Sequence, residues 1–180
     1  MSLITSTSPS DHYAPLGSIE STSPAEIATI VAQAHRSQIL WADMPVAERV
    51  RLLRELYDRF AGQKETIATS IATEMGMPIR LARDEVGYGL SYMLWYLDHA
   101  EESLVPEVVY ESDTEIHIVT HEPKGVVAAI TPWNYPFMLC VWACVQPLLA
   151  GNAVIWKISK EVILTGRLIG AMIENSSLPV

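Results

Sequence analysis

The last third of the chain alternates between two sequence patterns, and this alternation limits the possible folds more than any other feature. An apolar run from Val126 to Ile130 is followed by an apolar helical segment, Pro136 to Ala150, and by a second short run, Ala153 to Lys157. A helix from about Val162 to Asn175 comes next. Short apolar strands separated by helices are typical of a parallel sheet. We expect a right-handed parallel crossover whose strands are buried on both faces.

Four helices are expected before this region. Ser23 to Glu26 reads as a capping box with proline at the first helical position, so the first helix runs from about Pro24 to Trp41. The second opens at Pro45, and its apolar residues recur at helical spacing. The third spans about residues 63–74, and the fourth runs from Pro78 to about Ser103.

Two further segments lie outside these helices. Residues 1–22 are rich in Ser, Thr and Pro without periodicity, which predicts a flexible tail. After Pro106, Glu107 to Glu111 and Thr114 to Glu122 alternate in the manner of a hairpin with one exposed face. The sequence therefore predicts an α/β fold: N-terminal helices, a β hairpin at residues 107–122, and the first βαβα part of an incomplete parallel sheet.

Composition excludes some classes of protein. A chain of 180 residues with 49% hydrophobic residues can build a packed core and is not a disordered chain. The net charge of -9 argues against nucleic acid or an anionic membrane as a partner. The first basic residue is Arg36, so the start lacks the positive region of a secretory signal, and a cytoplasmic location is expected. The longest apolar stretch, 136–150, is shorter than the roughly 20 residues of a membrane span.

The two cysteines, Cys140 and Cys144, lie one helical turn apart. A thiol pair can contribute to a metal site, but it supplies only half of a tetrahedral ligand set, and no His or acidic residue lies nearby in the sequence. Free cysteine is among the most often buried residue types. We expect both cysteines to pack in the core and to bind no metal.

A polar motif, Thr131 to Pro136, lies where the first strand ends and the next helix begins. In α/β proteins this position binds ligands, because the helix N-terminus offers unpaired N–H groups and a partial positive charge. Asn134 suits the binding of an oxyanion there, although asparagine is also a common helix cap. Lys157 ends the second strand beside the same crevice, although a lysine at a strand end is often only the point where the chain meets water.

Two motifs together, Thr131 to Pro136 and Gly151 to Lys157, resemble the aldehyde dehydrogenase superfamily. Its members carry the patterns PWN-[FY]-P and GN-x-V-x-x-K in this order and at this spacing. The resemblance covers about Pro24 to Val180 and implies that residues 23–180 form the N-terminal part of a Rossmann-like NAD(P)-binding domain. It further implies that the whole enzyme oxidises an aldehyde to a carboxylic acid. The hairpin at 107–122 would join subunits into a homo-oligomer.

The same resemblance implies roles for single residues. Asn134 would be a catalytic residue that binds the oxyanion formed when a thiolate attacks the aldehyde carbonyl. Lys157 would bond the hydroxyls of the adenosine ribose. The implied cofactor-groove positions are Thr131, Pro132, Trp133 and Lys157. The implied positions along the tunnel by which the aldehyde enters are Tyr135, Leu139 and Trp142. Apolar residues at helical spacing are also typical of a protein core, so core packing is the alternative for these three.

One departure from the family pattern concerns the cofactor. Many members read K-P-S-E after the second strand, and the glutamate bonds the ribose, whereas this chain reads Lys157 to Lys160 as K-I-S-K. A carboxylate repels the 2′-phosphate of NADP, and Lys160 would attract it. Lys160 is therefore a further candidate cofactor-binding residue, and NADP is expected in preference to NAD.

The sequence does not contain the Gly-rich turn, the general-base glutamate or the nucleophilic cysteine of the family before Val180. We therefore expect a fragment that ends ahead of the catalytic cysteine and is inactive when isolated, because an oxyanion site without a thiolate has no covalent intermediate to stabilise. The alternative is a stand-alone nucleotide-binding or interaction module without catalytic activity.

Overall fold

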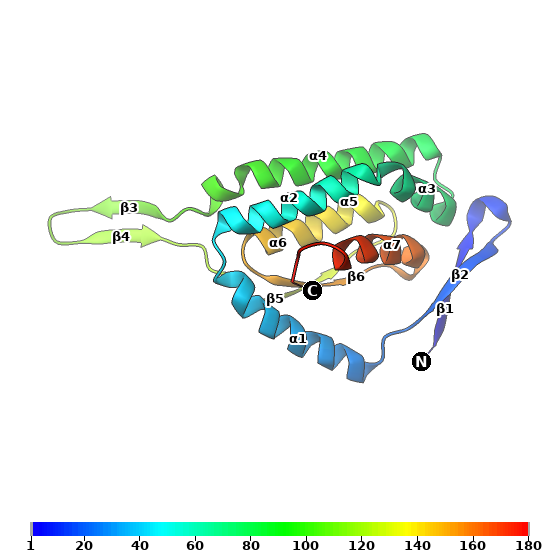
Figure 1. Cartoon of the computed structure of the whole chain (residues 1–180), viewed down its shortest axis with the longest axis horizontal. Helices are drawn as coiled ribbons and strands as arrows, with labels where there is room; N and C mark the ends of the chain where they lie inside the picture. Colours follow the sequence, from blue (N-terminus) through cyan, green and yellow to red (C-terminus); the bar gives the residue numbers. More distant parts are fainter. Residues whose placement is uncertain (1, 180) are drawn as a thin grey trace.

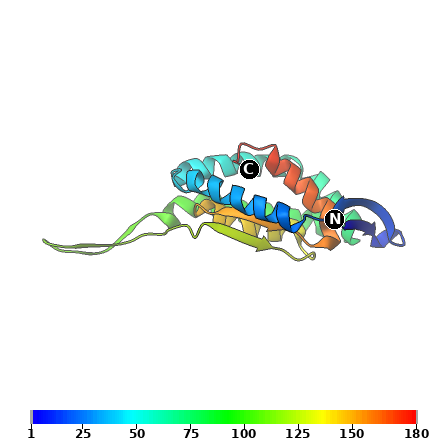
Figure 2. The same ribbon diagram turned by 90° about the horizontal axis from the view of Figure 1, so that it is seen from below.

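The computed structural model describes residues 2–179, whose helices lie against a two-stranded sheet while two hairpins project from opposite ends of the molecule (Figures 1 and 2). The described part of the chain thus has the predicted α/β architecture. In chain order the elements are β1 (Leu3–Ser8), η1 (Pro9–Asp11), β2 (Ala14–Glu20), α1 (Pro24–Ala42), α2 (Val46–Gly62), α3 (Lys64–Met75), α4 (Ile79–Leu104), β3 (Glu107–Glu111), β4 (Ile116–Val119), β5 (Val126–Ile130), α5 (Pro136–Cys140), η2 (Val141–Val145), α6 (Gln146–Leu149), β6 (Ala153–Lys157), η3 (Lys160–Val162) and α7 (Ile163–Glu174).

The four expected N-terminal helices are α1 to α4, and their bounds differ from the predicted ones by no more than one residue. The capping box of α1 is formed: Glu26 N donates to Ser23 Oγ at 3.3 Å, and Ser23 N donates to Glu26 Oε2 at 2.7 Å. Helix α3 ends at Gly76, whose φ of 70° lies in the left-handed region that glycine tolerates. These local signals therefore set the helix ends.

The prediction of a flexible tail over residues 1–22 is wrong for residues 3–20. Strands β1 and β2 pair antiparallel there, and the hydroxyls of Thr5 and Ser18 bond across the pair at 2.9 Å. Ser6 is buried and donates from Oγ to Glu74 Oε1 of α3 at 2.6 Å. Hydroxyl side chains, rather than alternating apolar ones, dominate this pairing, which is why a search for apolar periodicity misses it.

Glu74 ties three parts of the chain together. In addition to the Ser6 hydroxyl, its carboxylate accepts hydrogen bonds from Leu164 N at 2.9 Å and from Thr165 N at 2.8 Å, in the first turn of α7. The side chain is 3% exposed. A carboxylate at a helix N-terminus satisfies free N–H groups and interacts favourably with the helix dipole.

Strands β3 and β4 form the predicted hairpin, with an irregularity in register between Val108 and Tyr110. The second strand is shorter than the predicted Thr114 to Glu122. All residues of both strands are exposed, so the hairpin has two exposed faces instead of the predicted one. The reason is visible in Figure 2, where the hairpin extends away from the body and no other element lies behind it.

Strands β5 and β6 pair parallel, in register from Val126 with Ala153 to Ile130 with Lys157, which confirms the predicted parallel pair. The expectation that both faces are buried is wrong: Ala129 is buried, while the other residues of the two strands are half-buried or exposed. Helix α1 packs against the sheet. Within residues 2–179, β5 and β6 pair only with each other, so each of these two strands keeps one open edge.

The predicted helix over Pro136 to Ala150 consists of α5, a π-helical turn (η2) and α6 in direct succession. Pro147 follows the π turn and lies in the first turn of α6. Proline lacks the N–H that an α-helix interior needs, and π turns are one way in which a helix adapts to such a break. Cys140 and Cys144 lie in this helix, 3% and 7% exposed, which confirms the prediction of core packing.

The main core lies where α2, α3 and α4 pack around α5, η2 and α7. At its centre the rings of Phe60 and Phe137 meet edge to face, with their centroids 5.2 Å apart. Among the described residues, no helix combines the length and apolar character that crossing a membrane requires.

Candidate functional site

The two sequence motifs meet at the carboxyl edge of the β5–β6 pair. Ile130 and Lys157 are the last residues of the two strands and lie side by side in the parallel register. The pairing continues one residue further, because Thr131 N donates to Lys157 O at 3.1 Å. The chain that follows β5 and the chain that follows β6 therefore leave the sheet together, at the edge where open α/β sheets bind ligands.

Thr131 differs in its surroundings from the next two predicted cofactor positions. It is 4% exposed, and its hydroxyl accepts a hydrogen bond from Trp156 Nε1 at 2.9 Å. Pro132 is exposed, and Trp133 is 53% exposed. The structure thus places the rings of residues 132 and 133 at the surface, while the Thr131 hydroxyl is engaged inside the protein.

Asn134 is exposed, and it is not the cap of α5. The N-cap position of this helix is Tyr135, and no N-cap side chain bonds the helix end. The partner of the helix end is Glu85 of α4, whose Oε1 accepts from Met138 N at 2.7 Å. The capping alternative for Asn134 is therefore wrong, and within the described residues its carboxamide makes no hydrogen bond that holds the helix.

Glu85 was not identified from the sequence, where it stands as one charged residue in the run Arg83-Asp84-Glu85. It is 2% exposed, and Oε2 has no hydrogen-bond partner among residues 2–179. Burial raises the pKa of Glu85 from its ordinary 4.5 to about 7, against the lowering effect of the backbone N–H groups of Met138 and Phe137. A buried carboxylate beside a ligand-binding motif is a feature of functional sites.

Lys157 and Lys160 are both exposed, and they belong to β6 and η3. Lys160 Nζ lies 3.6 Å from Glu161 Oε1, with the two side chains 75% and 59% exposed, so this ion pair contributes little stability. Lys160 and Trp133 line a common cavity of about 380 Å³. The lining also includes Thr5, Thr7 and other residues of the N-terminal hairpin, which the sequence patterns did not connect with this site.

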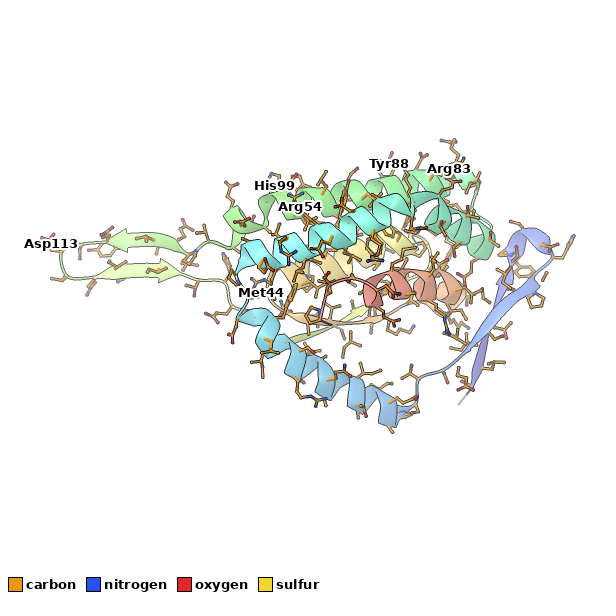
Figure 3. All side chains as sticks on the ribbon, viewed as in Figure 1. Met44, Arg54, Arg83, Tyr88, His99 and Asp113 are labelled. Atoms are coloured by element: carbon orange, nitrogen blue, oxygen red, sulfur yellow. The ribbon has the colours of Figure 1, made fainter. Side chains whose placement is uncertain are left out.

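The three predicted tunnel residues differ in exposure: Tyr135 is 44% and Trp142 38% exposed, and Leu139 is half-buried. The Trp142 ring meets the Tyr92 ring of α4 edge to face at 5.2 Å. Tyr92 is itself one of a row of exposed aromatic residues on α4, and Tyr88 is labelled in Figure 3. The spacing of Tyr88, Tyr92 and Trp95 by four and three residues is the sequence signal that could have revealed this row.

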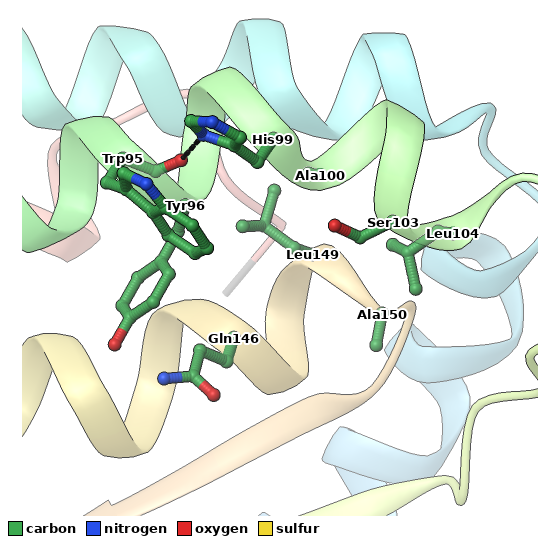
Figure 4. A pocket seen from close by; sticks show the side chains of 9 residues that line it. All are labelled: Trp95, Tyr96, His99, Ala100, Ser103, Leu104, Gln146, Leu149 and Ala150. Atoms are coloured by element: carbon green, nitrogen blue, oxygen red, sulfur yellow. Dashed lines mark hydrogen bonds between the residues drawn. The ribbon is translucent and has the colours of Figure 1, made fainter.

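A second cavity, of about 260 Å³, begins at Trp95, the last residue of this aromatic row, and continues along α4 (Figure 4). Trp95 and His99 stack there with their ring centroids 4.3 Å apart, and His99 Nδ1 lies 2.8 Å from Trp95 O. Gln146 and Leu149 of α6 form the other side. Residues 2–179 contain no group of three His, Cys, Asp or Glu side chains placed to hold a metal ion.

Comparisons with known proteins agree on one family. The model of the Aldehyde dehydrogenase family matches residues 2–180. A 3-sulfolactaldehyde dehydrogenase of Pseudomonas putida is 30% identical over 164 residues, which cover 91% of this chain and 34% of that protein. The crystal structure of an aldehyde dehydrogenase from Brucella melitensis biovar abortus 2308 superposes with a TM-score of 0.93 at 28% identity, covering 99% of this chain and 37% of that one.

A third similar protein carries a cofactor in its structure. It is the NADP-dependent glyceraldehyde-3-phosphate dehydrogenase from Bacillus halodurans C-125, complexed with NADP, with a TM-score of 0.91 and 29% identity. The superposition covers 99% of this chain and 38% of that one. The chain therefore spans between a third and two fifths of the length of these three relatives, 34–38%.

Proposed function

The chain belongs to the aldehyde dehydrogenase family, and on this premise we propose that it supplies the N-terminal portion of an NAD(P)-dependent enzyme that oxidises an aldehyde to a carboxylic acid. The observation that carries the proposal is the meeting of the Asn134 and Lys157 motifs at the carboxyl edge of one parallel strand pair. The two motifs are separated in the sequence but adjacent at the edge of the sheet where ligands bind. A site that holds a cofactor and a substrate side by side requires such an arrangement.

In this proposal Asn134 binds the oxyanion. Its carboxamide N–H would donate to the aldehyde oxygen as negative charge develops there, after attack by a thiolate from another part of the whole enzyme. A fixed donor at a developing oxyanion contributes about 3 kcal/mol to the stability of the transition state. The exposure of Asn134 and its freedom from capping support this role, because the carboxamide is available to a substrate.

The cofactor would lie along the same edge. A bound nicotinamide cofactor supplies the acceptor for the hydride that the substrate loses. Lys157 would donate to the ribose hydroxyls, Trp133 and Pro132 would form the groove wall, and Thr131 would contribute backbone atoms. The cavity that Trp133 and Lys160 help to line supports this position, since it offers apolar ring surface and an ammonium donor, although its lining also includes the Glu74 and Glu161 carboxylates.

We propose NADP as the preferred cofactor because Lys160 carries a positive charge where many relatives carry a glutamate. The side chain is 75% exposed and its neighbour Glu161 holds it only weakly, so the ammonium is free to turn toward a phosphate. Attraction between an ammonium and a 2′-phosphate would then favour NADP over NAD.

Tyr135, Leu139 and Trp142 would form one wall of the passage through which the aldehyde enters. They recur at helical spacing along one side of α5 and η2. The packing of Trp142 against Tyr92 supports an apolar wall that is shared by two helices. Such a wall would bind the carbon chain of the aldehyde while Asn134 addresses its oxygen.

We further propose a homo-oligomer in a cytoplasmic location. The hairpin β3–β4 supports an assembly role, because Val108, Ile116 and Ile118 are each more than half exposed on a segment that lies away from the body. Exposed apolar surface of this kind marks interaction sites.

A chimera tests the proposed activity. Residues 1–180 would replace the matching part of the Pseudomonas putida 3-sulfolactaldehyde dehydrogenase, and formation of NADPH or NADH would be followed with a series of aldehydes. Asn134→Ala should lower kcat about 10²–10³-fold, whereas Asn175→Ala, at the exposed end of α7, should leave kcat unchanged. Equal kcat values for the two variants would contradict the role of Asn134.

The isolated chain should form no NADPH or NADH, because Cys140 and Cys144 are both buried. The neighbouring Cys144 thiol, burial and Glu85 together raise the pKa of the Cys140 thiol well above its ordinary value, so it is a poor nucleophile. Turnover that disappears in a Cys140→Ser, Cys144→Ser double variant would contradict this expectation, and it would also argue against the alternative of a stand-alone module without catalytic activity.

A further inference from the structure

The first turn of α5 is held by a neighbouring helix instead of by its own cap. Its first residue, Pro136, has no N–H, and Leu139 N already donates to Tyr135 O at 2.9 Å. The N–H groups that remain are those of Phe137 and Met138. Met138 N donates to Glu85 Oε1 at 2.7 Å, and the Phe137 N–H also favours the charged form of this carboxylate. A free donor of this helix end is thus satisfied by one buried side chain of α4.

The position of Glu85 is fixed by close packing of the two helices. One turn further along α4, a Cβ on Gly89 would lie 2.6 Å from the ring of Phe137 and 3.3 Å from Met138 Cα. The glycine therefore lets the α4 and α5 backbones approach closely at the level of the carboxylate. Since Glu85 is 2% exposed in this contact, it has little freedom to move away from the helix end.

An asparagine two residues before the first residue of a helix would ordinarily compete for the helix N–H groups. Here Glu85 occupies the Met138 donor, and the Asn134 carboxamide stays exposed. Resting on the proposed oxyanion role of Asn134, we propose that Glu85 is a positioning residue: it caps α5 from outside, fixes the orientation of the segment Thr131 to Pro136, and leaves the Asn134 carboxamide free for substrate.

The cost of keeping this carboxylate supports a role beyond packing. Oε2 lacks a partner among the described residues, and an unsatisfied buried acceptor is unfavourable where an apolar side chain would fill the space. The titratable group on the α5 side is the Cys140 thiol, which lies beside the Cys144 thiol, and both cysteines are free. On the α3 side Arg83 is paired with Glu65. The Lys64 ammonium, also on α3, lies against α4 at Gly87, where a Cβ would be 3.1 Å from Nζ.

Nuclear magnetic resonance on the chain itself tests the proposal. In a pH series from about 5 to 9, the Met138 amide and the side-chain amide of Asn134 should shift together, with a common midpoint near pH 7. In Glu85→Gln, which keeps an acceptor oxygen but no charge, both signals should become independent of pH while Asn134 stays ordered. In Glu85→Leu, which keeps neither, the Asn134 carboxamide should cap the vacated N–H groups of α5, and its signals should move to the values of a hydrogen-bonded side chain.

Glu74→Gln is the matched control, because Glu74 is equally buried and also caps a helix from outside. It should shift the amides of Leu164 and Thr165 and leave Asn134 unchanged. If Met138 titrates while the Asn134 side chain does not respond, Glu85 has only a structural role and the proposal is overturned. A Met138 amide that shows no titration overturns it as well.

The pH series on the unmodified chain decides the question even where a variant fails to fold. This outcome is also independent of the chimera experiment. Full activity of the Asn134→Ala chimera would remove the proposed oxyanion role, whereas the resonance measurements would still show whether Glu85 controls the orientation of Asn134.

Discussion

Replacing Glu85 by glutamine should change how the stability of the protein depends on pH. The substitution keeps the size of the side chain and one acceptor oxygen for Met138 N, and it removes the group that titrates. Burial raises the pKa of Glu85 to about 7 in the folded protein, from an ordinary 4.5 that applies when the chain is unfolded. The folded state therefore holds the proton more tightly than the unfolded state.

The direction and size of the effect follow from this difference. Stabilisation by the protonated carboxyl is fully present below about pH 4.5 and is lost as the pH rises through about 7. A pKa difference of about 2.5 corresponds to about 3 kcal/mol at 1.36 kcal/mol per pKa unit. The free energy of unfolding of the wild type should thus fall by about 3 kcal/mol relative to Glu85→Gln between pH 4.5 and 8. Any constant cost of the amide cancels in this comparison.

Urea unfolding followed by tryptophan fluorescence at several pH values measures both curves. The carboxyls with lowered pKa, Glu26, Glu48 and Glu65, act at lower pH and are common to both proteins, so they do not disturb the difference. The two curves should converge toward pH 5 and diverge above it. A constant separation across pH 5–8, with unchanged m values, would refute the reasoning, because it would mean that Glu85 titrates alike in the folded and unfolded chains.

Three further predictions concern packing, cofactor and assembly. Gly89→Ala should lower the free energy of unfolding by about 1–3 kcal/mol, because the new Cβ would lie 2.6 Å from the buried Phe137 ring; Gly62→Ala meets nothing within 4 Å, and an equal loss in this control under urea would contradict the argument. In the chimera, Lys160→Glu should shift the ratio of kcat/KM from NADP toward NAD by about 1–2 kcal/mol, and an unchanged ratio would show that Lys160 does not contact the phosphate. Light scattering over a dilution series should show a dimer or larger oligomer that Ile118→Asp weakens, whereas a stable monomer at micromolar concentration would argue against an assembly role of the hairpin.

Local signals predicted most of the fold. The capping box at Ser23, the prolines at the helix starts and the apolar runs of β5 and β6 each act over a few residues, so a single sequence reveals them. Strands β1 and β2 were missed because their pairing depends on hydroxyl groups and on a contact between Ser6 and Glu74, 68 residues apart. No periodic pattern records a contact of that range.

Only those residues of the candidate site that stand in local sequence motifs were predicted. Asn134 and Lys157 stand in motifs, and the parallel register brings their segments together. Glu85 carries no such signal, since it looks like any other charged residue of a long helix. Its burial and its bond to Met138, 53 residues away, distinguish it from Asp84, and neither can be read from the sequence. The wall contributed by the N-terminal hairpin depends likewise on tertiary packing.

The three hydrogen bonds that Glu74 accepts have a consequence for the order in which segments of the chain pack during synthesis. Its carboxylate joins Ser6 to the amides of Leu164 and Thr165, the last of which is 91 residues further along the chain. At about 5–20 residues per second, a ribosome needs roughly 5–20 s to pass from the codon of Glu74 to that of Thr165. During this interval β1 and β2 can pair with each other and reach Glu74, but α7 has not yet contributed its share of the bond. The connection from β1 through Glu74 to α7 is thus complete only after α7 has been made, long after β1 and Glu74 themselves.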